Sequence, residues 1–314
     1  MRVAITGISG YLGRLVAEHL ARDPEVDSIL GLDVVAPGSL PPGARFTAAD
    51  VRCADFERLL QGFDAVVHLA FIVTPRRKVS LAEIDAINVA GSRRVFEGAV
   101  AAGVSRIVYA SSTAAYGAHV GNPEPLTEEH PLRPNPDWYY SRTKGQVEDL
   151  LDELEARHPE LVVIRLRPCV VLGPTINNPL GMLFDRRFLI SSGKPYRLDL
   201  CWDDDVAAAF GLALHHPESD RFNLAGERPL DMNRAGTLLG KRVIRLSPWW
   251  VRPLVRLATR LGLLSPGVLG WLEAIANGPI NASAERARQR LGWTPRFDSE
   301  GTLMEYVRRR QQSA

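Results

Sequence analysis

Tyr140 and Lys144 form the residue pair whose types and spacing most directly suggest chemistry. They lie four positions apart within 139–157, a stretch with helical periodicity, so both side chains are expected on one helix face. A lysine ammonium near a phenol favours the phenolate and lowers a tyrosine pKa from its usual value of about 10. Tyr140 would then serve as a general acid–base near neutral pH. Lys144 is one of only four lysines in the chain, although an exposed helical pair would have the same spacing.

A run of three hydroxyl residues, Ser111-Ser112-Thr113, follows the strand-like segment 106–110. In open α/β sheets, the carboxyl end of a strand faces the crevice in which ligands bind. A plain polar loop would have the same composition, so the run is informative only together with the tyrosine and the lysine.

A glycine turn begins directly after the first apolar segment of the chain. Gly7, Gly10 and Gly13 are spaced three apart, between the strand-like 2–6 and the helical pattern of 11–21. The first glycine permits a tight turn, the second lets the backbone approach a pyrophosphate, and the third lets the helix pack close to the strand. The helix N-terminus would stabilise the phosphate charge, so the turn predicts a dinucleotide site.

Asp33 ends the second apolar segment, 28–32, and lies 20 residues after Gly13. A carboxylate there accepts hydrogen bonds from the adenosine ribose hydroxyls and repels a 2′-phosphate. Val34 and Val35 follow, so no basic side chain is supplied for such a phosphate. The sequence therefore favours NAD over NADP as the cofactor.

Short apolar segments alternate with amphipathic ones through the first half of the chain. The strand-like segments are 2–6, 28–32, 65–69, 106–110 and 161–166, and the helical ones are 11–21, 84–101 and 139–157. This alternation predicts an α/β fold with a doubly wound parallel sheet, the Rossmann fold, covered by helices on both faces. Such a sheet would place the hydroxyl run at the ligand crevice.

Proline and glycine become frequent after the fifth strand-like segment, and the periodicity weakens. The clearest later elements are a helix at 205–215 and a strand at 222–224. We predict an NAD-binding Rossmann domain over 1–170, with later crossover segments around 201–226. A smaller C-terminal substrate-binding lobe would make up most of 171–314.

The overall composition is that of an ordinary globular protein, with 46% apolar and 24% charged residues and a formal net charge of +2. So small a charge argues against a nucleic-acid binder, which needs a concentrated positive field. No apolar run reaches membrane-spanning length, and no secretory pattern is visible. Cys53, Cys169 and Cys201 are far apart in sequence and form no CxxC pair, so we expect no disulfide, no metal site and a cytoplasmic location.

In their order along the chain, these motifs resemble the extended short-chain dehydrogenase/reductase superfamily, specifically its NAD-dependent epimerase/dehydratase family. The residues that carry the resemblance are Gly7/Gly10/Gly13, Asp33, Asp50-Val51, His68-Leu69-Ala70, Asn88-Val89, Ser111-Ser112, Tyr116-Gly117, Tyr140, Lys144, Arg167-Pro168, Gly173-Pro174, Asp204-Asp205-Val206-Ala207, Phe222-Asn223 and Leu291-Gly292-Trp293-Thr294-Pro295. They span nearly the whole chain.

The resemblance implies hydride transfer between a substrate secondary alcohol or ketone and NAD. It makes Tyr140 the general acid–base and Lys144 the residue that binds the nicotinamide ribose and tunes the tyrosine. Ser112, four residues before the Tyr116-Gly117 pair, would hold the substrate oxygen, with Thr113 as second choice. The cofactor contacts that it implies are Gly7, Gly10, Tyr11, Leu12, Gly13, Asp33, Asp50, Val51, Leu69, Ala70, Phe71, Asn88, Ser111, Tyr140, Lys144 and Pro168.

Several positions depart from the family pattern at the substrate end. Thr113 and Ala114 replace the acid pair of the 4,6-dehydratases, so dehydration is not expected. Val170 and Leu198 stand where nucleotide-sugar members commonly have an Asn and an Arg for the substrate diphosphate, although Arg197 is adjacent. A buried diphosphate without charge-assisted donors is costly, so these residues favour a less charged substrate.

The segment 246–275 is strongly apolar and also carries a basic stripe, Arg252, Arg256 and Arg260. Its apolar residues include Trp249, Trp250, Leu254, Leu261, Leu263, Leu264, Val268, Leu269, Trp271 and Leu272. They could line a pocket for an apolar or small alcohol, or simply form the core of the lobe. The stripe could touch an anionic membrane or substrate, but a solvated helix face is the better interpretation.

The leading expectation is an NAD-dependent alcohol dehydrogenase or carbonyl reductase with a small-molecule substrate. One alternative is a UDP-sugar 4-epimerase, in which the ketone intermediate takes the hydride back on its other face. The other is a non-catalytic NAD-binding scaffold or redox sensor, against which the complete set of Ser112, Tyr140 and Lys144 argues. Family members often dimerise through two helices, here 84–101 and 139–157, so we also expect a homodimer.

Overall fold

The centre of the protein is a seven-stranded parallel sheet. The computed structural model describes residues 1–73, 79–176, 181, 184–191, 197–245, 253, 257–258, 261 and 278–312. The sheet has the strand order β10-β6-β5-β4-β1-β2-β3, and all neighbouring strands are parallel. Its strands are β1 (Arg2–Thr6), β2 (Ser28–Asp33), β3 (Ala44–Ala48), β4 (Ala65–His68), β5 (Arg106–Ala110), β6 (Val162–Pro168) and β10 (Asp220–Leu224).

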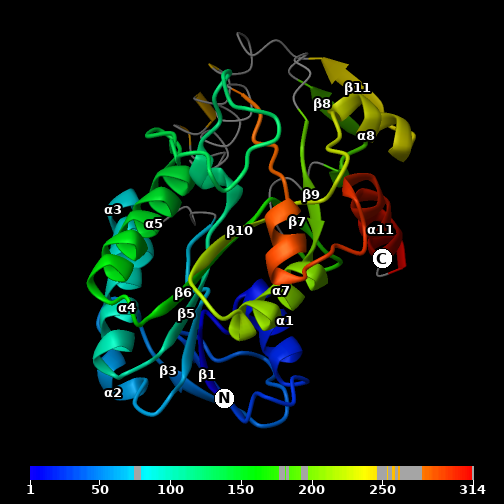
Figure 1. The fold of residues 1–314 in the computed structure, drawn as a ribbon. Coiled ribbons are helices and arrows are strands. Elements are labelled where there is room, and N and C mark those ends of the chain that lie inside the picture. Colours follow the sequence, from blue (N-terminus) through cyan, green and yellow to red (C-terminus); the bar gives the residue numbers. More distant parts are fainter. Residues whose placement is uncertain are drawn as a thin grey trace.

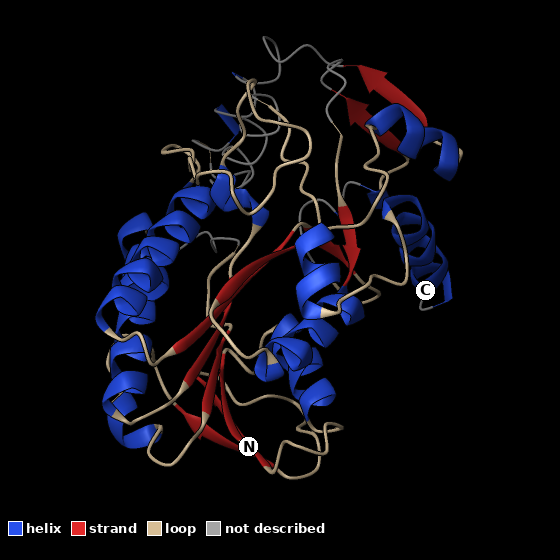
Figure 2. Ribbon diagram, in the orientation of Figure 1, coloured by secondary structure: helices blue, strands red, loops and turns tan. Residues whose placement is uncertain are grey.

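Helices cover both faces of this sheet, as Figures 1 and 2 show. One layer contains α1 (Tyr11–Leu20) and α7 (Asp203–His215), and the other contains α2 (Phe56–Leu59), α4 (Gly91–Ala101) and α5 (Tyr139–Arg157). Successive residues of β1 alternate between two buried clusters: Val3 and Ile5 pack with the first layer, and Ala4 packs with the second. The predicted doubly wound Rossmann fold is therefore confirmed.

The structure differs from the expected elements mainly between the helical segments. The predicted helix over 84–101 is divided, because α3 (Leu81–Asp85) leads through a π-helical turn, Ala86–Ala90, into α4. A capping box between Ser80 and Glu83 starts α3. The edge strand β3 was not predicted because it is only partly buried and lacks a continuous apolar run.

Beyond β6 the chain builds smaller elements that the sequence did not predict. They are the parallel pair β7 (Val170–Leu172) and β9 (Leu200–Trp202), the parallel pair β8 (Phe188–Ser191) and β11 (Arg242–Arg245), and the helices α8 (Met232–Leu239) and α11 (Ser299–Gln312). They share a third buried cluster that includes Leu200, Leu303 and Tyr306. The apolar segment 246–275 and its basic stripe lie almost entirely outside the described residues. Within the described part of the chain, no helix is long and apolar enough to cross a bilayer.

Candidate active site

The carboxyl edge of the sheet gathers the motifs that the sequence singled out. The glycine turn follows β1, Asp33 ends β2, Leu69 and Ala70 follow β4, Ser111 and Ser112 follow β5, and Pro168 ends β6. The strand ends lie level because Thr6 pairs with both Leu32 and His68, and Ala110 pairs with Leu166. The topology thus brings together residues that are more than 150 positions apart.

The glycine turn has the geometry that a pyrophosphate cradle requires. Gly7 adopts a φ of +75°, and a Cβ there would lie 2.6 Å from the Ala70 nitrogen. A Cβ at Gly13 would lie 2.1 Å from the Gly7 oxygen, so the helix meets the turn in direct backbone contact. Gly10 caps α1 without any side chain, so the first N–H groups of the helix are left for an anion. The turn therefore fits a dinucleotide.

Asp33 lies beside this turn and is partly exposed. Its Oδ2 accepts the Ser9 backbone N–H at 3.1 Å, and its Oδ1 accepts the Val34 N–H at 2.7 Å. These bonds fix the carboxylate next to the glycine turn, where it can receive ribose hydroxyls. Val34 and Val35 are both exposed and apolar, in keeping with NAD rather than NADP.

The residues predicted at the adenine lie at the end of β3. Arg52 donates hydrogen bonds to both carboxylate oxygens of Asp50 and thereby lowers the pKa of that carboxyl group. Val51 is buried against Gly91 at the start of α4. The contact of Asp50 and Val51 with adenine remains a prediction.

Tyr11, although predicted at the cofactor, is engaged in another contact. Its hydroxyl donates to the Asp203 carboxylate at the start of α7, and a Cβ on Gly173 would collide with both groups. Burial and the Asp203 hydrogen bond both raise the pKa of Tyr11. The side chain therefore links the glycine turn to the segment beyond β6, and Leu12 packs against the core beside it.

Ser112 and Tyr140 meet at the end of β5. The Ser112 hydroxyl donates a hydrogen bond to the Pro168 carbonyl at 3.4 Å and accepts one from the Ala114 N–H at 3.1 Å. Burial raises the pKa of Tyr140, and the nearby Ser112 side chain only partly opposes this effect. The sequence-based expectation of a lowered tyrosine pKa is therefore wrong for this structure, because burial disfavours the phenolate more strongly than its neighbours favour it.

Lys144 follows Tyr140 by one helical turn of α5 and is buried beneath it. Its Nζ donates to the Ala110 carbonyl at 2.5 Å and to the Tyr109 hydroxyl at 3.2 Å. Burial lowers the pKa of Lys144 well below its usual value, while the charge of Glu148 acts in the opposite direction. The two residues of the motif thus share one helix face, as predicted.

A buried ion network behind this pair was missed by the sequence reasoning. Glu148, one further turn along α5, accepts two hydrogen bonds from Arg167 at 2.8 Å and one from Ser111 at 2.5 Å. Burial alone would raise the pKa of Glu148, but Arg167 and Arg165 lower it to about 2. Its spacing of four residues from Lys144 is the signal that could have revealed it. Ser111 thus gives its hydroxyl to Glu148, and its role at the cofactor stays a prediction.

Hydrogen bonds from polar side chains support the end of β4 and the backbone that follows it. Asn88 is buried, accepts the Ile72 N–H at 2.8 Å and donates to the Ile72 carbonyl at 3.1 Å. The hydroxyl of Thr6 lies 2.6 Å from His68 Nδ1. Asn88, expected at the cofactor, therefore supports the backbone beside Ala70 and Phe71.

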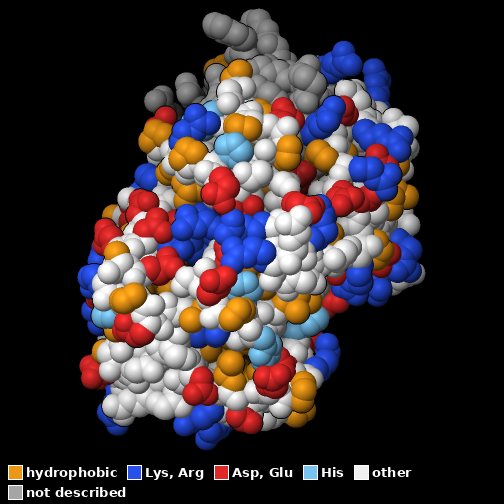
Figure 3. All heavy atoms as spheres, in the orientation of Figure 1, with side chains coloured by type: hydrophobic (Ala, Val, Ile, Leu, Met, Phe, Trp, Pro, Cys, Tyr) orange, Lys and Arg blue, Asp and Glu red, His pale blue; other side chains and the backbone are white. Residues whose placement is uncertain are grey.

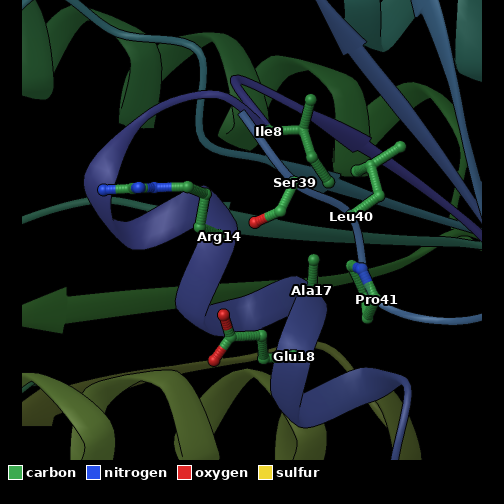
Figure 4. A pocket seen from close by; sticks show the side chains of 7 residues that line it. All are labelled: Ile8, Arg14, Ala17, Glu18, Ser39, Leu40 and Pro41. Atoms are coloured by element: carbon green, nitrogen blue, oxygen red, sulfur yellow. The ribbon is translucent and has the colours of Figure 1, made fainter. Parts of the chain in front are cut away.

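Two clefts lie elsewhere on the surface. One, of about 470 Å³, is charged and lined by Glu128, Glu129, His130, Pro131, Leu132, Asp149, Asp152, Arg167, Arg221 and Arg286. Figure 3 shows basic side chains gathered, with acidic ones around them, on the face that β10 occupies in Figure 1. The other, of about 90 Å³, lies between α1 and Pro41, and in Figure 4 Arg14 points away from it. That second volume is far too small for a dinucleotide.

Comparison with known proteins identifies the family. A model described as the NAD dependent epimerase/dehydratase family matches residues 3–225. The chain belongs to this family. NAD is accordingly its cofactor, and the glycine turn and Asp33 are the features of the structure that fit it.

Relatives within the family carry different activities. UDP-glucose 4-epimerase of Streptomyces lividans is 34% identical over 163 residues, 49% of this chain and 47% of that protein. The 4-hydroxy-2-methyl-3-oxo-4-farnesyl-3,4-dihydroquinoline-1-oxide ketoreductase of Stigmatella aurantiaca is 28% identical over 249 residues, 76% of this chain and 72% of that protein. MoeE5, solved with UDP-glucuronic acid and NAD, shares the fold with a TM-score of 0.78 at 22% identity over the full length of both chains.

Proposed function

We propose that this protein is an NAD-dependent oxidoreductase that interconverts a secondary alcohol and a ketone. The observation that carries the proposal is the grouping of Ser112, Tyr140 and the buried Lys144 at the carboxyl edge of the sheet, where the Lys144 Nζ lies 5.8 Å from the centre of the Tyr140 ring and the Ser112 side chain acts to lower the pKa of Tyr140. A scaffold that only binds NAD would have no need for this combination of groups.

The side chains have distinct roles in the proposed reaction. In the oxidative direction Tyr140 accepts the proton of the substrate hydroxyl, and Ser112 donates a hydrogen bond to the oxygen as it becomes a carbonyl. The charge of Lys144 favours the phenolate that this step requires. Bound NAD supplies the hydride acceptor, or in its reduced form the donor.

The surroundings of the site support a substrate without a diphosphate. Val170 and Leu198 both pack against the apolar cluster of the smaller elements, and Leu198 pairs with Leu230 through two backbone hydrogen bonds. Trp138 and Ile280 pack in one apolar cluster with Tyr140. The printed name of the Stigmatella relative describes a ketoreductase for a compound that carries a farnesyl group and no phosphate, which agrees with an alcohol or ketone substrate without a diphosphate here.

A second candidate is a UDP-sugar 4-epimerase. It is favoured by the Streptomyces relative and by Arg197, which is exposed next to Leu198 and could meet a phosphate. In that reaction the ketone would take the hydride back on its other face, and no reduced cofactor would accumulate.

One experiment separates these candidates. The protein is incubated with NAD⁺ and either secondary alcohols of increasing chain length or UDP-sugars, and NADH absorbance and sugar isomers are measured. Stable NADH with an alcohol supports the oxidoreductase, whereas isomerised sugar without net NADH supports the epimerase. Tight NAD binding with no turnover of either class would contradict both and favour a redox sensor.

A tyrosine variant tests the assigned acid–base. We expect Tyr140→Phe to bind NAD normally and to lose turnover by about 10²-fold or more, because the proton acceptor is removed. Tyr306→Phe is the matched control, since its hydroxyl contacts Asp185 on a different part of the fold. Unchanged turnover in Tyr140→Phe would remove this residue from the mechanism.

A further inference from the structure

The ammonium group of Lys144 lies among aromatic rings. Its Nζ is 3.6 Å from the ring centre of Phe71, 4.7 Å from that of Tyr109 and 5.8 Å from that of Tyr140. The Phe71 and Tyr140 rings contact each other edge to face at 5.9 Å. A cation within about 6 Å of a ring face is attracted by the negative charge over that face, and the attraction is strongest away from water.

The polar contacts of Lys144 leave part of its bonding capacity for a ligand. An ammonium has three donors, and two are used by the Ala110 carbonyl and the Tyr109 hydroxyl. Among the described residues no acceptor is recorded for the third. That donor is therefore available to a ribose hydroxyl.

The charged groups nearest to Lys144 do not form an ion pair with it. Glu148 lies on the same helix, but Arg165, Arg167 and Ser111 already occupy its carboxylate. His68, on β4, is neutral because burial, together with the charge of Lys144, lowers its pKa to about 3. Tyr109 and Tyr140 are the other titratable neighbours, and burial raises the pKa of each. Beyond the hydrogen bonds to the Ala110 carbonyl and the Tyr109 hydroxyl, the rings are therefore the nearest groups that compensate the buried charge.

We propose that Phe71 and Tyr109 form an aromatic cage that keeps the Lys144 ammonium charged and in place beneath Tyr140. Phe71 is thus a positioning residue that acts through Lys144. The Asn88 side chain fixes the backbone next to Phe71, because it hydrogen-bonds both the N–H and the carbonyl of Ile72. The inference deepens the proposed oxidoreductase site, but the charge state of Lys144 can be measured whether or not that activity is found.

The small number of lysines makes the measurement direct. In protein labelled with ¹³C at lysine, only four side chains contribute signals, and a Lys144→Arg variant identifies the one of interest. Its chemical shift is followed from pH 5 to pH 11 in wild type, Phe71→Leu and Phe71→Tyr. Phe56→Leu, in the same buried layer, is the control for lost aromatic volume.

We expect Phe71→Leu to lower the titration midpoint of Lys144 by about one pH unit, the size of a desolvated cation–π contact. Phe71→Tyr and Phe56→Leu should leave it near the wild-type value. The proposal is overturned if Phe71→Leu does not move the midpoint, or if Phe56→Leu moves it equally.

A second series avoids any change in side-chain size. Phenylalanine that carries one, two or three fluorine atoms is inserted only at position 71. The fluorine atoms withdraw electron density from the ring face while the packing is preserved. The midpoint should fall stepwise with each fluorine, and a flat series would exclude the cage. If NADH production is found, the pH profile of kcat should move in Phe71→Leu but not in Phe71→Tyr, a split that a purely structural role would not cause.

Discussion

Burial has opposite consequences for the two residues at the centre of the site. It raises the pKa of Tyr140 and lowers that of Lys144, so each residue alone would be neutral. In the proposed reaction, a charged Lys144 favours the Tyr140 phenolate and so acts against the effect of burial. The proposed chemistry therefore depends on the groups that compensate the buried charge of Lys144, which in our proposal are Phe71 and Tyr109.

At the cofactor end, Asp33 should set the preference for NAD. Asp33→Ala is expected to weaken NAD binding by about tenfold or more, because hydrogen bonds to a charged acceptor are lost, and to affect NADP less. Asp27→Ala is the control, since Asp27 pairs with the N-terminus. Titration of intrinsic fluorescence with both cofactors measures the effect. Equal affinity of the wild type for NAD and NADP would contradict the assignment.

Among the elements, the junction of β1 and α1 tolerates the least change. The helix begins in backbone contact with the glycine turn, and Gly13 has no room for any side chain there. The start of β9 is fixed by a buried carboxyl group rather than by close backbone contact. Asp199, the residue before β9, is buried and accepts the Ala282 N–H at 2.7 Å.

Gly13→Ala should therefore disrupt the turn. A methyl group 2.1 Å from the Gly7 oxygen must push the helix away from the strand, so we expect loss of NAD binding and a lower melting temperature. Gly38→Ala, where a Cβ meets nothing within 4 Å, is the matched control. Calorimetry and NAD titration check both variants, and normal NAD binding by Gly13→Ala would refute the cradle.

Asp199 should make stability fall as pH rises. Burial raises its pKa to about 7 from an unfolded value of 3.8, although the Ala282 and Asn281 hydrogen bonds oppose this. A raised carboxyl pKa gives stability that is complete below the unfolded pKa and is lost as pH rises through the folded one. Ionisation of Asp199 should thus lower the free energy of unfolding by up to about 3 kcal/mol between pH 5 and pH 8.

The variant Asp199→Asn keeps an acceptor for Ala282 but cannot ionise. Urea unfolding at pH 5 and pH 8 should show a smaller loss of stability for the variant than for the wild type. The same pH dependence in both proteins would mean that Asp199 ionises freely in the folded state.

At the scale of the whole molecule, the N-terminus of α7 joins distant parts of the chain. Asp203 accepts from Tyr11, Asp204 lies 2.6 Å from His19, and Asp205 accepts from Arg296 at 2.5 Å. These contacts fix α1, α7 and the segment before α11 to one another near the glycine turn.

The expected homodimer is also a question for the whole molecule. The predicted interface segments, 84–101 and 139–157, carry Arg93 within 3.7 Å of Glu97 and 3.6 Å of Glu153, and no large exposed apolar side chain is found in them. A dimer through this face would be held largely by charges. We therefore expect light scattering to show a dimer at 0.1 M salt that weakens at 1 M, because salt screens such contacts. A monomer at both salt concentrations would contradict the interface.

Much of the fold could be predicted because its signals are local. The alternation of apolar strands with amphipathic helices specified the parallel sheet, and α5 lies where the periodicity placed it. The divided helix at 84–101 and the edge strand β3 escaped prediction. The first depends on a π-helical turn in a continuous helical pattern, and the second on pairing with β2 rather than on its own apolar run.

The sequence by itself determined the dinucleotide turn, the carboxylate at Asp33 and the spacing of Tyr140 and Lys144, because each is a relation between residues close along one or two elements. Only the tertiary structure decided what surrounds them. Glu148 is bound by arginines from β6, and the rings around Lys144 come from the ends of β4 and β5 as well as from α5. Burial and charge depend on such contacts between distant segments, so the direction of the Tyr140 pKa shift could not be obtained from the spacing of the motif.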